Sequence, residues 1–286
     1  MASQAPIEFD IALIGMGVRH VTHMTLEGID VLRRCRRGFV VSPDQKAVDD
    51  FQAALGSCLK PGDSLPPLAT LGQAYRRDRK RSENYAEATG LVLEATEAGR
   101  PIAYLTPGNP VVFDTVAQEI LAGARARGWR ALVIPGISSV DTVLADLGQE
   151  PAPGLQLYDA SCFVGAAVKP DTRFTCLLMQ IGVFGTNYAV IGREPRADAL
   201  AALKDYLLQF YPCEHVVVLV RSAPNLDRPA SIHYVTVGSL DHVAPDSQRG
   251  SSLYIPALSV PQLEPGFRDR MDSPDNLKAR YARSSN

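Results

Sequence analysis

Paired cysteines are missing from this sequence. The cysteines are odd in number and lie far apart, with none of the spacings that suit a zinc site or a redox dithiol. His20 and His23 are neighbours in sequence, but no third ligand follows at a suitable spacing, so we expect no bound metal. We expect reduced thiols, most of them buried, at the five cysteines Cys35, Cys58, Cys162, Cys176 and Cys213.

The sequence also lacks a large excess of either charge and any long hydrophobic run. A net charge of −2 argues against nucleic acid as the main partner, because duplex-binding proteins carry basic surfaces. The apolar runs are shorter than the ~20 residues of a membrane span. Residues 1–8 do not have the charged and then apolar layout of a secretory signal. We therefore expect a cytoplasmic protein with no membrane partner.

What the chain does have is enough apolar material for two α/β domains, at 286 residues and 46% hydrophobic. In residues 1–137, apolar runs alternate with helical patterns, which predicts a parallel sheet wound with helices. In residues 138–261 the runs lie closer together with one long helical pattern at 197–210, which predicts a mixed sheet. The expected strands are 10–14, 38–41, 101–105 and 131–134, then 173–179, 215–220, 232–237 and 251–255.

Two further segments have a distinct composition. Residues 148–154 are rich in helix breakers and are interpreted as a linker or domain crossing. Residues 262–286 form a polar tail that we expect to lie on the surface or to be disordered.

Two Pro-Gly elements follow predicted strands and precede predicted helices. The first is the segment Leu-Thr-Pro-Gly-Asn-Pro-Val-Val-Phe at 105–113, and the second is Ile-Pro-Gly-Ile-Ser-Ser at 134–139. Such loops at the carboxyl ends of parallel strands bind small molecules in open α/β sheets. A Gly-Met-Gly follows the first strand at 15–17, but it lacks the third glycine of the dinucleotide fingerprint, which disfavours a nicotinamide cofactor.

These three loops, in this order, resemble the tetrapyrrole methylase superfamily of S-adenosylmethionine-dependent methyltransferases. That superfamily has a Gly-x-Gly after its first strand, a Pro-Gly-Asp-Pro-like loop, here 107–110, and a Pro-Gly-x-Ser-Ser loop, here 135–139. The likeness covers about residues 9–256. Within the superfamily the chain is most similar to the borosin peptide backbone α-N-methyltransferases, through the segments 17–26, 75–85, 145–147, 159–161 and 179–182.

The resemblance implies two α/β domains, a homodimer, and S-adenosylmethionine in the cleft between the domains. Backbone groups, short hydroxyls and an amide suit this cofactor, because it carries no phosphate. Asn109 departs from the acidic residue of the wider superfamily and from the histidine of borosin enzymes. Gln180 has the alternative role of satisfying a sheet edge, and Ser138 and Ser139 that of a helix cap. The positions that match cofactor contacts are Gly15, Gly17, Pro107, Gly108, Asn109, Val111, Phe113, Ser138, Ser139, Gln180, Arg221, Ser222, Ala223, Ser251, Ser252 and Leu253.

A basic stretch flanked by tyrosines, residues 75–85, is by composition a solvated charged loop. The resemblance implies a catalytic role instead, because Tyr75, Arg81 and Tyr85 match the tyrosines and arginine that face the methyl group in borosin enzymes. A further tyrosine of that pattern is replaced by Gly72. An amide nitrogen is a poor nucleophile, so its methylation needs a base and a group that stabilises the charge on oxygen. We expect Tyr75 or Tyr85 to accept the proton, with a guanidinium favouring the phenolate, and Arg81 to polarise the carbonyl.

The expected acceptor is a peptide. Fused borosin enzymes carry an apolar core peptide at the C-terminus, and residues 278–286 contain no such core, so the resemblance implies a precursor peptide supplied in trans. A methyltransferase of the same fold that acts on a tetrapyrrole or another small molecule is one alternative, because the basic stretch also suits an acceptor with many carboxylates. A non-catalytic protein that binds S-adenosylmethionine is the other, and the joint presence of the three matching side chains disfavours it.

Overall fold

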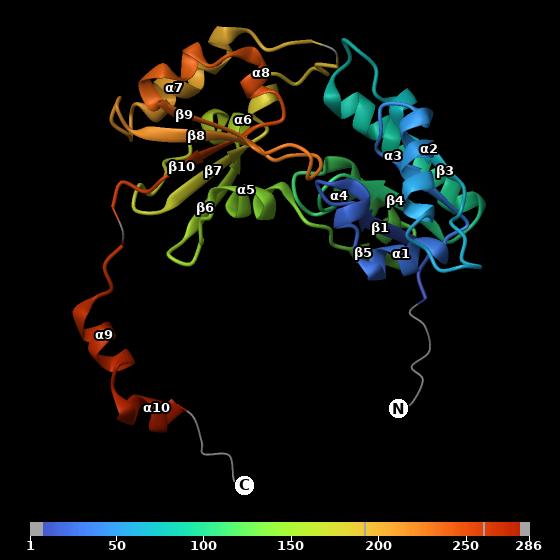
Figure 1. The fold of residues 1–286 in the computed structure, drawn as a ribbon, viewed down its shortest axis with the longest axis horizontal. Helices are drawn as coiled ribbons and strands as arrows, with labels where there is room; N and C mark the ends of the chain where they lie inside the picture. Colours follow the sequence, from blue (N-terminus) through green and yellow to red (C-terminus); the bar gives the residue numbers. More distant parts are fainter. Residues whose placement is uncertain (1–7, 192, 260, 281–286) are drawn as a thin grey trace.

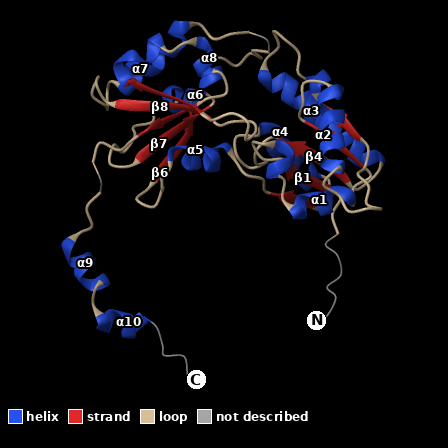
Figure 2. Ribbon diagram, viewed as in Figure 1, coloured by secondary structure: helices blue, strands red, loops and turns tan. Residues whose placement is uncertain are grey.

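The computed structural model describes residues 8–191, 193–259 and 261–280, which form two α/β units side by side (Figure 1). Each unit has its own sheet, with helices against it (Figure 2). Residues 1–7, where a secretory signal was not expected, and 281–286, the end of the polar tail, lie outside the described residues. Among the described residues no helix is both long and apolar enough to cross a membrane.

The first sheet has the strand order β3-β2-β4-β1-β5, and its strands are parallel. Its central strands are apolar on both faces, as parallel strands covered by helices must be. Helices α3 and α4 cover one face of the sheet, and α1 and α2 cover the other. The strands are β1 (Ile11–Gly15), β2 (Arg37–Val40), β3 (Leu68–Thr70), β4 (Ile102–Thr106) and β5 (Ala131–Ile134). The helices are α1 (Leu26–Arg33), α2 (Gln45–Gly56), α3 (Arg81–Ala98) and α4 (Thr115–Ala126).

The second sheet has the order β6-β7-β10-β8-β9 and is mixed, as expected. Strands β6 and β7 pair in parallel, whereas β7, β10, β8 and β9 pair antiparallel. Helices α6 and α7 pack on one face, and α5 packs on the other. The strands are β6 (Leu155–Asp159), β7 (Thr175–Met179), β8 (Val216–Arg221), β9 (Ser231–Thr236) and β10 (Ser252–Ile255). The helices are α5 (Ser139–Leu147), α6 (Ala160–Gly165), α7 (Ala201–Leu207) and the short α8 (Pro245–Gln248).

Two local expectations need correction, and one of the two alternatives for the tail is confirmed. The chain passes between the sheets before α5, since α5 packs on the second sheet, so residues 148–154 connect α5 to β6 and are not the crossing. The described part of the polar tail is exposed, as one of its two expected alternatives has it, and it forms the helices α9 (Pro265–Met271) and α10 (Pro274–Arg280), which extend away from both units (Figure 1). The cysteines are free as expected, but only Cys35 and Cys176 are buried, and the other three are exposed.

Candidate active site

Three loops meet at the carboxyl edge of the first sheet, and glycines make this possible. The amide of Gly17 donates to the carbonyl of Gly108 and the amide of Gly108 to that of Gly17, both at 3.0 Å. A Cβ on Gly15 would lie 2.4 Å from the nitrogen of Gly136 and 2.5 Å from the oxygen of Gly108. A side chain therefore cannot enter this point, and the backbones of the loops after β1, β4 and β5 pack directly on one another.

The loop after β4 presents apolar side chains to solvent. The Asn109 side chain accepts a hydrogen bond from the amide of Val111 at 3.1 Å, which closes a local turn. Phe113 has a left-handed backbone, with φ of 55°. Val111 remains 53% exposed and Phe113 37% exposed. Loops that expose large apolar groups beside a sheet edge are typical of binding sites.

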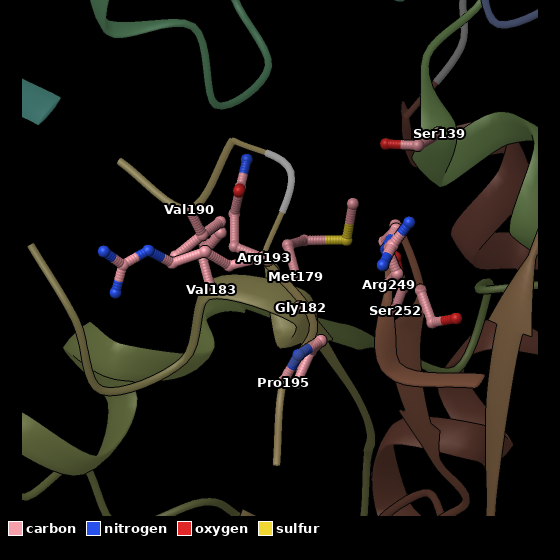
Figure 3. A pocket seen from close by; sticks show the side chains of 12 residues that line it. Ser139, Met179, Gly182, Val183, Val190, Arg193, Pro195, Arg249 and Ser252 are labelled. Atoms are coloured by element: carbon pink, nitrogen blue, oxygen red, sulfur yellow. The ribbon is translucent and has the colours of Figure 1, made fainter. Parts of the chain in front are cut away.

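A cavity of about 320 Å³ lies where β7 ends, next to the start of α5 and the residues before β10 (Figure 3). Gln180 follows β7 with a left-handed backbone, φ 65°, a costly conformation for a residue with a Cβ. Figure 3 shows the hydroxyl of Ser139 directed toward the space above Met179. The lining residues are Ser139, Met179, Gln180, Gly182, Val183, Val190, Arg193, Pro195, Arg249, Gly250, Ser251 and Ser252.

A larger groove of about 1060 Å³ runs between the two units. Gln180 lines both the groove and the smaller cavity, so the two adjoin at this residue. Groups from both units face it: Lys80, Arg81, Ser82, Tyr85, Val111, Phe113, Asp114, Thr115, Gln118 and Glu119 from the first, and Asp159, Ser161, Cys162, Gln180, Asn187 and Tyr188 from the second.

The start of α3 is tied to the second unit. The amide of Arg81 donates to the carbonyl of Asn187 at 2.7 Å, and the amide of Ala189 donates to the carbonyl of Arg79 at 2.8 Å. The guanidinium Nη2 of Arg81 donates to the carbonyl of Thr186 at 2.7 Å. These contacts fix Arg81 at the groove and join the units there.

The structure brings the three residues that match the catalytic pattern into one region. Arg81 and Tyr85 line the groove, one helical turn apart on α3. The ring of Tyr75 packs edge-on against that of Tyr85, with centroids 6.3 Å apart. Burial raises the pKa of Tyr75 far above its ordinary value, and the Asp114 carboxylate adds to this rise. This is opposite to the expected phenolate, because burial disfavours the charged form and the neighbouring carboxylate is negative.

Several matched cofactor positions hold the loops in place and have their own partners. Ser138 caps α5, accepting from the amide of Asp141, whose carboxylate in turn accepts from Ser138. The hydroxyl of Ser222 donates to Asp146, and Arg221 donates to backbone carbonyls at 3.0 and 3.2 Å. Leu253 is buried in the second core.

Of the matched cofactor positions, Ser139, Gln180, Ser251 and Ser252 line the smaller cavity, and Val111, Phe113 and Gln180 line the groove. Several cavity residues had no predicted role: Gly182, which lies in a segment of the borosin resemblance, and Val183, Val190, Arg193, Pro195, Arg249 and Gly250, which lie in irregular segments without a motif. Asp114 had no predicted role either. At Gly72, a Cβ would lie 2.2 Å from the carbonyl oxygen of Pro43, so a tyrosine does not fit there with this backbone. In the described part of the chain, no cluster of three or more His, Cys, Asp or Glu side chains could hold a metal ion.

The chain is similar to known borosin proteins. It is 28% identical over 187 residues to a methyltransferase/ribosomally synthesized type I borosin cyclic peptide precursor from Serendipita vermifera, a match that covers 64% of this chain and 43% of that protein. Its match to a protein of the same description from Cerrena unicolor is 23% identical over 289 residues and covers 96% of this chain and 67% of that protein. The chain thus spans less than half of the first relative and about two thirds of the second.

The fold is similar to that of solved methyltransferases. Uroporphyrin-III C-methyltransferase from Thermus thermophilus, complexed with S-adenosylhomocysteine, superposes with a TM-score of 0.52 at 17% identity, covering 86% of this chain and 96% of that one. This likeness confirms the expected two-unit α/β architecture. The family model of the Tetrapyrrole (Corrin/Porphyrin) Methylases matches residues 10–223, three quarters of the sequence, and the chain therefore belongs to this family.

Proposed function

We propose that this protein is an S-adenosylmethionine-dependent methyltransferase that methylates backbone amide nitrogens of a peptide. The observation that carries the proposal is that a small cavity and a larger groove share the lining residue Gln180, with Arg81 and Tyr85 on the groove wall. Family membership supports methyl transfer, and the borosin relatives, described as methyltransferase and peptide precursor, support a peptide acceptor.

The smaller cavity suits the cofactor. Its volume of about 320 Å³ is at the lower end of small-molecule sites, which span roughly 300–1,000 Å³. Hydroxyls of Ser139, Ser251 and Ser252 and the amide of Gln180 offer hydrogen bonds, while Met179, Val183 and Val190 offer apolar surface. The similar uroporphyrin-III C-methyltransferase is complexed with S-adenosylhomocysteine, which supports S-adenosylmethionine as the cofactor. When bound, S-adenosylmethionine supplies a methyl group on a sulfonium.

The groove suits an extended peptide better than a tetrapyrrole. Exposed apolar side chains, among them Val111 and Tyr188, can contact the side chains of an extended chain. The charged lining of the groove is mixed, with Asp114, Glu119 and Asp159 beside Lys80 and Arg81, so it has no uniformly positive wall for the many carboxylates of a tetrapyrrole. A peptide does not need such a wall, and the mixed charge of the groove therefore favours a peptide.

We assign the roles at the reacting amide by position and charge. Arg81 polarises the acceptor carbonyl and stabilises the charge that develops on its oxygen, because its guanidinium is permanently positive and fixed by Thr186. The phenol oxygen of Tyr75 or Tyr85 receives the amide proton. Alignment of the acceptor nitrogen with the methyl carbon contributes much of the rate.

We further propose that the protein acts as a homodimer, as the family resemblance implies. Light scattering of the purified protein in solution measures this directly. A mass near 30.9 kDa, that of one chain, would contradict it.

The function is tested by incubating the protein with S-adenosylmethionine and a panel of synthetic peptides with apolar cores, followed by tandem mass spectrometry. We expect the mass gain of a methyl group on backbone nitrogens. A panel that stays unmodified while a tetrapyrrole is methylated would favour the small-molecule alternative. Conversion of the cofactor to S-adenosylhomocysteine with acceptor present would exclude a purely binding role.

The residue roles are tested with paired variants. We expect Tyr75→Phe and Arg81→Lys to slow methylation strongly while the cofactor still binds. Arg76→Lys is the control for Arg81, because Arg76 belongs to the same basic stretch and pairs with Glu87. If Tyr75→Phe and Arg81→Lys both keep wild-type turnover, the assignment is wrong.

A further inference from the structure

The proton taken from the acceptor amide needs a final base. Burial holds the Tyr75 hydroxyl in its neutral form at ordinary pH, since its pKa is raised. A neutral phenol can accept the amide proton only if its own proton leaves at the same time. A base must therefore lie near the tyrosine pair.

Asp114 is the candidate for this base. It follows Phe113 at the end of the loop after β4 and lines the groove together with Arg81 and Tyr85. Its negative charge contributes to the raised pKa of Tyr75, so the carboxylate and that phenol are electrostatically coupled.

The Asp114 carboxylate is held from two sides. Its Oδ1 accepts the amide of Ala117 at 2.9 Å, which caps α4. The Tyr104 hydroxyl donates to Oδ2 at 2.9 Å and to Oδ1 at 3.2 Å. Tyr104 is on the central strand β4 and only 1% exposed, so it is a rigid support. The hydrogen bond to the amide of Ala117 is enough for a helix cap, so the hydrogen bond from the buried Tyr104 hydroxyl is an additional restraint on the carboxylate.

Two other carboxylates of the groove are already engaged differently. Glu119 accepts from the hydroxyl of Thr89 at 2.9 Å. Asp159 caps α6, accepting from the amide of Cys162 at 2.9 Å. Asp114 differs from both in being held by a buried tyrosine and coupled to Tyr75.

We propose that Asp114 is the final proton acceptor of the methylation, and that Tyr104 is a positioning residue that holds its carboxylate. The inference rests on the proposed function. The acceptor nitrogen forms its bond to the methyl carbon as the carbon–sulfur bond breaks, with that electron pair staying on sulfur. The amide proton passes to a phenol oxygen of the Tyr75–Tyr85 pair, and the phenol's own proton passes to Asp114. The products are the N-methylated amide, the neutral thioether, the neutral phenol and a protonated Asp114.

The test compares Asp114→Asn with Asp44→Asn. Asparagine caps helices about as well as aspartate, so both variants keep their helices. Asp44 caps α2 by accepting from the amide of Ala47 at 2.9 Å. Asp44→Asn therefore makes the same chemical change at a helix cap outside the groove. We expect Asp114→Asn to lower kcat at least about 100-fold, the usual contribution of a proton-transfer group, and to leave KM for the peptide and the calorimetric Kd for S-adenosylmethionine within about threefold. Tyr104→Phe should lower kcat about tenfold with unchanged KM, because the base remains but is less well held.

Chemical rescue separates a base from a structural role. The smaller Asp114→Ala leaves space for an added carboxylate, so formate or acetate should restore part of kcat, with the more basic acetate faster at equal occupancy. Sodium chloride at matched ionic strength should not. A structural role predicts instead a loss of melting temperature that formate does not repair, with no rescue of rate.

The outcomes are distinct. If wild-type protein methylates its peptide and Asp114→Asn keeps more than a third of that rate, this inference is refuted and the proposed function stands. If wild-type protein methylates no peptide, the proposed function is refuted, and the inference with it.

Discussion

Three loop backbones are in contact at Gly15, so a single added methyl group there should lower the stability of the protein and weaken its binding of S-adenosylmethionine. In Gly15→Ala, the new Cβ would lie 2.4, 2.5 and 2.8 Å from backbone atoms of Gly136 and Gly108, where real Cβ contacts stay above about 3.0 Å. The loops after β4 and β5 must therefore move by roughly half an ångström or more. Overpacking of this kind costs about 1–3 kcal/mol. In a chain of this size that is a fall of roughly 2–10 °C in melting temperature.

The same displacement should weaken cofactor binding, because the moving loops carry Phe113 toward the groove and Ser139 toward the cavity. We expect at least a tenfold rise in Kd for S-adenosylmethionine, about 1.4 kcal/mol, measured by titration calorimetry beside thermal melts followed by circular dichroism. Gly90→Ala is the matched control. A Cβ on Gly90, within α3, meets nothing within 4 Å, so the helix should gain about 0.5–1 kcal/mol. A Gly15→Ala protein with wild-type melting temperature and Kd would refute the reasoning.

Three more predictions follow from local geometry. The left-handed backbone of Gln180 costs about 1–2 kcal/mol for a residue with a Cβ, and glycine removes this cost. Gln180→Gly should therefore keep or slightly raise the melting temperature, and a lower melting temperature would contradict this. The same change should weaken cofactor binding in calorimetry. Asp10→Asn should lower the free energy of unfolding by about 1 kcal/mol at neutral pH, because the amide of Arg130 holds the pKa of Asp10 below its ordinary value. Since that pKa is depressed in the folded state, the contribution is complete above the unfolded pKa of 3.8 and is lost as pH falls through the folded pKa, so urea titrations of the two proteins should converge there. Arg193→Ala removes an ion pair with Asp78 that links the units, and because this pair is exposed the melting temperature should change by less than about 2 °C. Arg193 also lines the cavity, so cofactor dissociation measured by stopped flow should become faster.

Much of the first unit follows from the sequence, because a buried parallel strand has a simple signature. The expected strands 101–105 and 131–134 differ from β4 and β5 by at most one residue at either end. Strand β3 was missed because its three residues are too few to establish a pattern. Strand β6 was missed because none of its residues is fully buried, and Gln156 and Asp159 interrupt its apolar character.

The two helices of the tail each begin with a proline, a local start signal that the polar composition of the tail does not reveal. In α9, Pro265 occupies the first turn and the Glu264 side chain accepts from the amides of Gly266 and Phe267, while α10 begins at Pro274. Proline at the start of a helix is favoured, because its missing N–H would have no partner there. Polar composition predicted a tail on the surface or in disorder; the described part of the tail is exposed, as the first alternative has it, and these two local starts make most of it helical.

The charge state of Tyr75 could not be predicted from the motif, because it depends on tertiary neighbours. The sequence places Arg81 six residues away and suggests that its guanidinium favours a phenolate. In the fold, Arg81 donates to the carbonyl of Thr186 in the other unit. Burial raises the pKa of Tyr75, and the charge of Asp114, nearly forty residues along the chain, adds to the rise. The position of Asp114 depends on the turn at Phe113 and on the Tyr104 hydroxyl, neither of which a spacing rule detects. A motif thus predicts which residues face one another here, but the charge state of a buried phenol depends on the burial and the carboxylate that the fold supplies.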